Sequence, residues 1–223
     1  MAYSPLPAKA AGDVFDKTAY DIIKADLEAS APGVVAAKGD LVAATGANAI
    51  ARLAAGADGS TIVYDSTTSV GLAAQTQPAA RVWNDADIDP APGGWVTLTF
   101  NNENAGNGCF DTDAMHSLVS NTGRLTVPAG GGGIYTLGGC VKLDTTGGPA
   151  NDPVRLRIRV DGATEIARVQ GHTGSDIELS VVTAYSLIAG QYAELQIFTE
   201  ENVDVLTDNY HSPVFWAIYQ RRA

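Results

Sequence analysis

The sequence predicts a mainly β protein, in which an antiparallel sandwich or barrel follows a short helix and a segment of very short strands. Three observations carry this prediction. Glycine and alanine are abundant while only 17% of residues are charged, a turn-rich composition that suits many short strands. Apolar runs separated by turn signals fill the chain from residue 78 onward. Only residues 13–29 show helical periodicity over the length of a helix.

The β-domain is expected to span residues 78–223. Its candidate strands are 80–84, 95–100, 123–128, 133–143, 153–160, 163–169, 177–187, 191–199 and 213–220. In 154–160, aliphatic residues alternate with three arginines, so the apolar side chains face one way. Asp161-Gly162 then forms a hairpin turn signal. Strands at this spacing, with no helical pattern between them, favour an antiparallel sandwich or barrel.

The N-terminal region, residues 1–33, is predicted to hold an amphipathic helix over residues 13–29. Asp13 or Asp16 can cap its start, and Ser30-Ala31-Pro32-Gly33 ends it. A lone helix of this length is marginal in water, so its apolar stripe must be covered. The cover is the chain's own β-domain, another copy, or a host assembly. The stripe makes an anchoring site from Phe15, Ile22, Ile23 and Leu27.

Residues 34–77 form a Gly/Ala-rich segment of short apolar pieces between turns. The strand candidates are Leu41-Val42, Ile50–Leu53 and Thr61–Tyr64. None is long enough to bury a core within one chain, so we expect an intertwined segment stabilised by pairing between several copies. The expected oligomerisation residues are Leu41, Ile50, Leu53 and Ile62. A flexible linker is the alternative.

Ordered motifs in the β-domain resemble the jelly roll shared by complement recognition globular heads and tumour-necrosis-factor ligands. The motifs are Trp95 to Asn101 with Glu103, Leu125–Ala129, Gly133-Ile134-Tyr135, Arg157–Gly162, Leu187–Tyr192 and Ser212–Ala217. The resemblance implies a C-terminal antiparallel jelly-roll sandwich and a trimer. The glycine run 130–133 and the loop 144–152 depart from the pattern. Residues of the knob core or trimer interface are expected to be Trp95, Phe100, Tyr135, Tyr192, Phe215 and Trp216.

The segment from Lys38-Gly39-Asp40 to Gly71-Leu72 resembles a module of bacteriophage fibre and tail proteins. The leader around Gly12-Asp13-Val14 is similar to leaders of the same proteins. Together these resemblances imply a homotrimeric phage virion protein, assembled in the cytoplasm of the bacterial host. Its N-terminal segment would contact other virion proteins, and its knob would face outward toward a host-surface glycan or protein.

Composition excludes several partners and compartments. The formal charge of −11 repels phosphate backbones and anionic lipid, so we expect neither nucleic acid nor membrane insertion. We expect no signal peptide, because residues 1–11 lack a basic region followed by an apolar run. Cys109 and Cys140 lack metal-ligand spacing and are expected to be buried and reduced.

No catalytic constellation is visible, so we expect no enzyme, no cofactor and no metal. His116, His172 and His211 lie far apart in the sequence. The glycines at 130–133 lack the lysine of a phosphate loop. Acidic clusters at Asp85/Asp87/Asp89, Asp111/Asp113 and Glu200/Glu201/Asp204 could ligate calcium, but solvated loops explain them better. Trp83, Trp95 and Trp216 lie in strand candidates and are expected in the core.

Several functions remain open at this point. A virion protein could be associated with the tail, which the fibre-like module favours, or could be a capsid decoration or head fibre. A soluble carbohydrate-binding adhesin would need exposed aromatic residues and a pocket. A glycan-cleaving tailspike would need two carboxylates at a defined separation over a cleft.

Overall fold

A computed structural model describes residues 17–28, 35–46, 49–145, 151–174, 177–208 and 211–222. The chain divides into two compact units, residues 1–76 and 77–223. The described residues contain a single α-helix, α1 (Lys17–Glu28), which confirms a helix within 13–29. Ile22 and Ile23 on it are half-buried. Phe15 and the side chain of Leu27 lie outside the described part of the chain.

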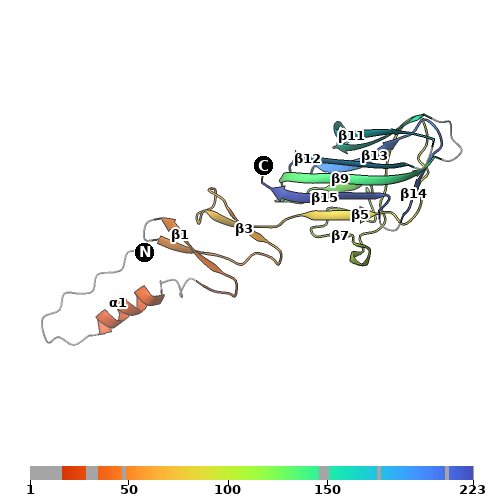
Figure 1. The fold of residues 1–223 in the computed structure, drawn as a ribbon. Helices are drawn as coiled ribbons and strands as arrows, with labels where there is room; N and C mark the ends of the chain where they lie inside the picture. The colour runs from red at the N-terminus through yellow and green to blue at the C-terminus, as the bar shows by residue number, and fades with distance from the viewer. Residues whose placement is uncertain are drawn as a thin grey trace. The chain divides into compact units, whose positions relative to one another are not determined.

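Two β-hairpins follow the helix in the described part of the first unit (Figure 1). Strand β1 (Leu41–Gly46) pairs with β2 (Ala49–Leu53), and β3 (Thr61–Tyr64) pairs with β4 (Leu72–Gln75). Gly39 and Gly59 adopt φ of +89° and +83° in the turns that lead into β1 and β3, a conformation that glycine adopts readily. The three predicted strands are present, and β4 was not predicted.

The hairpins change one part of the sequence prediction. Strand partners were expected to come from other copies, but the chain supplies them itself because each strand folds back on its neighbour. What the hairpins lack is buried area: Ile62 is 53% exposed and Tyr64 is 93% exposed. A two-stranded hairpin is marginal in water, so these surfaces still need a cover.

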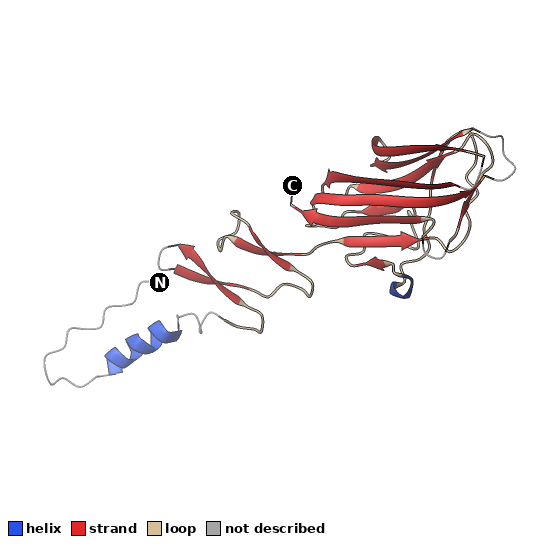
Figure 2. Ribbon diagram, in the orientation of Figure 1, coloured by secondary structure: helices blue, strands red, loops and turns tan. Residues whose placement is uncertain are grey.

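The second unit is built from two antiparallel sheets (Figure 2). The first sheet has the order β12 (Ile177–Leu187), β9 (Gly133–Asp144), β15 (Val214–Arg221), β5 (Ala79–Trp83) and β7 (Phe110–Asp111), with β14 (Asp204–Leu206) beside β9. The second has the order β11 (Thr164–His172), β10 (Pro153–Val160), β13 (Tyr192–Phe198) and β6 (Trp95–Thr97), with β8 (Arg124–Thr126) also paired to β13.

The strand order identifies the second unit as a jelly roll. The last strand, β15, inserts between β5 and β9, while β13 inserts between β8 and β10. Eight strands therefore form the two interleaved four-stranded sheets β5-β15-β9-β12 and β8-β13-β10-β11. The predicted mainly β architecture with a C-terminal antiparallel jelly roll is confirmed.

The core lies between the inner faces of the two sheets, because alternate residues of each strand point inward. In β10, every second residue from Val154 to Val160 is buried, as its alternation predicted. Phe100 and Phe215 stack there with ring centroids 5.9 Å apart. Tyr135 is fully buried and its hydroxyl donates to the Gly131 carbonyl at 2.6 Å.

All nine strands predicted after residue 78 are present, two with the predicted bounds and seven with shifted ends. The largest differences are at the ends of 163–169, where β11 continues to His172, and of 95–100, where β6 ends at Thr97. The chain nonetheless stays against β13, since the Leu98 amide donates to the Leu195 carbonyl at 2.9 Å. Strands β7 and β14 and the 3-10 helix Ala105–Asn107 were not predicted. They are two or three residues long, too short for periodicity to show.

Candidate interaction surface

The outward side chains of β12, β9, β15, β5 and β7 form a surface with few charges, called the apolar face from here on. Strand register places one residue from each strand in a row across it: Val182, Gly138, Trp216, Arg81 and Phe110. Val182 is 59% exposed and Ile218 in the next row is 38% exposed. Apolar side chains therefore cover much of the outside of this sheet.

The position of the Trp216 side chain requires a glycine at residue 138. A Cβ atom on Gly138 would lie 2.2 Å from Cζ2 of Trp216, so the half-buried indole lies directly over the glycine backbone. A glycine within a strand often marks this kind of close approach. Trp216 was expected in the core, but its strand position points outward because Phe215 and Ala217 point inward.

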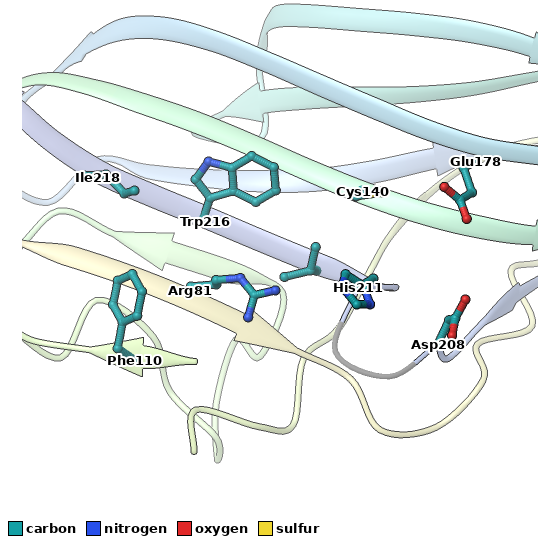
Figure 3. Close-up of a pocket in the computed structure, with 9 residues that line it drawn as sticks. Arg81, Phe110, Cys140, Glu178, Asp208, His211, Trp216 and Ile218 are labelled. Atoms are coloured by element: carbon teal, nitrogen blue, oxygen red, sulfur yellow. The ribbon is translucent and has the colours of Figure 1, made fainter. Parts of the chain in front are cut away.

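The apolar face is hollowed beside Trp216 (Figure 3). The hollow has a volume of about 690 Å³ and is lined by Arg81, Phe110, Cys140, Glu178, Asp208, His211, Val214, Trp216 and Ile218. The Arg81 guanidinium is turned toward the Gly108 carbonyl, to which it donates at 2.9 Å. Asp208 is paired with Lys142, at 3.2 Å from its Nζ.

Both cysteines are free thiols. Cys109 is buried, and this burial raises the pKa of its thiol. Cys140 is half-buried on the apolar face, where the Ser180 hydroxyl donates to its Sγ at 3.3 Å. The expected burial therefore holds for Cys109 only, because Cys140 falls on the outward register of β9.

The outward side chains of β6, β8, β10, β11 and β13 form a contrasting surface, called the guanidinium face. Arg157 lies over the Trp95 ring, 3.8 Å from its centroid, and Arg124 lies 3.9 Å over Tyr192. Trp95 and Tyr192 are thus half-buried under arginines. The core position expected for Trp95 is wrong, since Val96 beside it packs on the core instead.

The remaining predicted residues take other positions. Trp83 is buried but is not part of the core cluster between the sheets. Its indole nitrogen donates to the Ser212 carbonyl at 3.1 Å. His116 is also buried, with Nδ1 2.5 Å from Glu103 Oε1 and Nε2 2.9 Å from the Thr122 carbonyl.

The described residues contain no group of three or more metal-ligating side chains. None of the described helices has the length and apolar character needed to span a membrane.

Sequence reasoning missed several residues of the apolar face: Arg81, Phe110, Gly138 and Val182. Two of them carried a signal. Val182 is an apolar residue on the outward register of 177–187, and the Gly138-Gly139 pair lies inside a strand pattern. Phe110 carried none, because β7 is only two residues long.

Comparison with known proteins adds little beyond the fold. No protein-family profile matches the sequence. No curated protein matches it. Among solved structures the chain is similar to the crystal structure of murine APRIL at pH 5.0, a jelly roll of the tumour-necrosis-factor family. The identity is 8% and the TM-score 0.47, over 65% of this chain and 100% of that one. The jelly roll itself is assigned from the strand order above, and a phage origin stays a prediction.

Proposed function

We propose that the chain is a trimeric structural protein of a bacteriophage virion. Its N-terminal segment docks in the particle and its jelly roll is displayed outward, in association with the tail. The observation that carries the self-association is the contrast between the two outer faces of the sandwich. One is ionic, with most of its arginines hydrogen-bonded or ion-paired within it, and the other presents Val182, Trp216 and Ile218 to solvent.

The apolar face suits contact with further copies of the chain. An antiparallel sheet usually pairs one apolar side with one solvated side, yet this sheet has a core on one side and apolar residues on the other. Its central charge, Arg81, is engaged by the Gly108 carbonyl. Large exposed apolar patches mark interaction sites, and closed symmetric rings cover such patches on every copy. The choice of three copies follows the resemblance.

The first unit also has exposed apolar side chains that contact with further copies of the chain would bury. The two hairpins expose Leu41, Val42, Ile62 and Tyr64. Their sequence resembles a module of phage fibres, which supports a place in the virion. Parallel copies of these hairpins would bury Leu41 and Ile62, two of the four residues that the sequence nominated for oligomerisation.

Deletion of residues 1–33 tests the place in the virion. This change removes the helix and its half-buried Ile22 and Ile23 but leaves both hairpins and the jelly roll. We expect the shortened protein to fold and to be absent from purified particles, as measured by mass spectrometry of the particles. Incorporation equal to that of the full chain would contradict the proposal. The position of the full chain in the particle, tail or capsid surface, separates a tail protein from a capsid decoration.

A soluble glycan-binding adhesin is the second candidate. The hollow favours it, because two aromatic side chains, Trp216 and Phe110, line it together with the carboxylates of Glu178 and Asp208. Aromatic rings with a few convergent polar groups are typical of ligand sites. The two candidates differ in what covers the hollow: a second copy in the virion protein, and a sugar in the adhesin.

A further inference from the structure

Basic side chains are concentrated on the guanidinium face. Residues 77–223 carry nine basic and 17 acidic side chains. The strands of the guanidinium face contribute five of the basic ones and only two of the acidic ones, Glu165 and Glu194. The five are Arg124, Arg155, Arg157, Arg159 and Arg168. A positively charged surface therefore lies on a unit in which acidic residues outnumber basic ones everywhere else taken together.

Several of these arginines are held close to one another. Arg157 and Arg168 are directly opposite across the β10–β11 pair, an arrangement of like charges that destabilises a sheet. Glu165 lies between them, 3.2 Å from Arg157 NH1 and 3.5 Å from Arg168 Nε. Burial lowers the pKa of Arg157, and the nearby charges of Arg159 and Arg168 lower it further. Because this repulsion destabilises the sheet, it suggests that the arginines are placed together to bind a ligand.

Among the five arginines of the guanidinium face, Arg159 is the one whose guanidinium has no hydrogen bond or ion pair within the described residues. In register it lies between Glu165 on β11 and Glu194 on β13. Glu165 is engaged by Arg157 and Arg168, and Glu194 is bonded to Arg124 Nε at 2.9 Å. No hydrogen bond to the Arg159 guanidinium is present among the described residues. Its donors, together with those of the 53% exposed Arg168 side chain, are available to an external anion.

We propose that the guanidinium face binds a polyanionic glycan, a sugar chain bearing carboxylate, sulfate or phosphate groups. Arg155, Arg157 and Arg159 lie two residues apart along β10, so their side chains recur about every 6.6 Å. Guanidinium groups in an ordered row can each bind one anionic group with paired hydrogen bonds. Gln196 holds Arg157 through bonds of 2.9 and 2.7 Å, which fixes the row before a ligand arrives.

The same surface suits nucleic acid less well. Single strands are bound by stacking their bases on open aromatic rings. Here Trp95 and Tyr192 are covered by Arg157 and Arg124, and Phe198 lies under Arg155 at 5.0 Å. The net charge of −11 also opposes a long phosphate backbone that extends beyond this face. A glycan with spaced charges needs only the row of arginines.

Calorimetric titration of the full chain tests this proposal, with heparin and polygalacturonate as the anionic probes. Neutral dextran and a single-stranded oligonucleotide serve as comparison ligands. In 50 mM NaCl we expect at least one anionic glycan to bind, more weakly at 300 mM, and dextran not to bind. The double variant Arg159→Gln/Arg168→Gln should weaken binding about tenfold or more. The matched variant Arg221→Gln, an exposed arginine on β15, should leave it unchanged.

Three outcomes would overturn the proposal: no heat with either anionic glycan, equal affinity in the double variant, or tighter binding of the oligonucleotide than of both glycans. Circular dichroism of each variant shows whether the fold is retained. The proposal rests on the proposed function in that a displayed knob meets a host surface, but it fails separately. A trimer that binds no glycan overturns only this inference, and a glycan-binding monomer overturns only the trimer.

Discussion

At the scale of single residues, Gly138 and Trp216 show how one missing side chain shapes a surface. The indole can lie flat on the sheet only because β9 has no Cβ at this position. Leu195 lies against the neighbouring Gly139 in the same way, with Cδ2 2.5 Å from its would-be Cβ, but on the core side. The two glycines thus admit one large side chain on each face of the sheet.

Replacing Gly138 with alanine should displace the indole. The added methyl would overlap Trp216, so we expect a loss of about 1–3 kcal/mol in the free energy of unfolding and weaker self-association. Urea unfolding and sedimentation equilibrium, at one fixed protein concentration, measure the two effects. Gly94→Ala is the matched control, because nothing lies within 4 Å of a Cβ there. Equal association of both variants would contradict a role for the indole in the contact.

At the scale of elements, the first hairpin is closed by one carboxylate. Asp40 accepts hydrogen bonds from the amides of Ala36, Ala37 and Ala55 at 2.9, 2.7 and 3.1 Å. Arg52 NH1 lies 3.3 Å from the same carboxylate. The backbone bonds, chiefly that from Ala36, hold the pKa of Asp40 below its ordinary value. The carboxylate ties the entry turn of β1 to the exit of β2.

Acid should therefore open this hairpin. Because the folded-state pKa is depressed, the stabilisation is present at neutral pH and is lost as the pH falls below the ordinary aspartate range. We expect the amides of Ala36, Ala37 and Ala55 to lose protection from hydrogen exchange on acidification. Asp40→Asn should cause the same loss at neutral pH, while Asp58→Asn in the turn before β3 should not. Unchanged protection in Asp40→Asn would contradict the assignment.

Some strands could be predicted from the sequence and others could not. The long strands were predictable because alternation persists over many residues, as in 153–160. β4 was missed because Leu72–Gln75 offers little alternation, and its place is set by pairing with β3. The outward position of Trp95 was also unpredictable. It depends on which side of the sheet faces the core, a tertiary property that strand propensity does not contain.

At the scale of the molecule, the sandwich has two outer faces of opposite character. The guanidinium face is ordered by bonds such as that from Arg157 to Gln196 and remains polar. The apolar face leaves Val182 and Ile218 in solvent. The proposed trimer assigns the first face to the outside and the second to contact between copies. The candidate surface was thus only partly predictable, since Trp216 was nominated but its face was not.

The mass of the full chain in solution tests this account most directly. Light scattering at micromolar concentration should give three times the chain mass of 23.1 kDa. Val182→Arg should reduce it to that of a single chain, because it places a charge in the contact. Val119→Arg should leave it unchanged, since Val119 is 93% exposed in a loop and is not part of any strand of the apolar face. A wild-type chain at the mass of one copy would contradict the account.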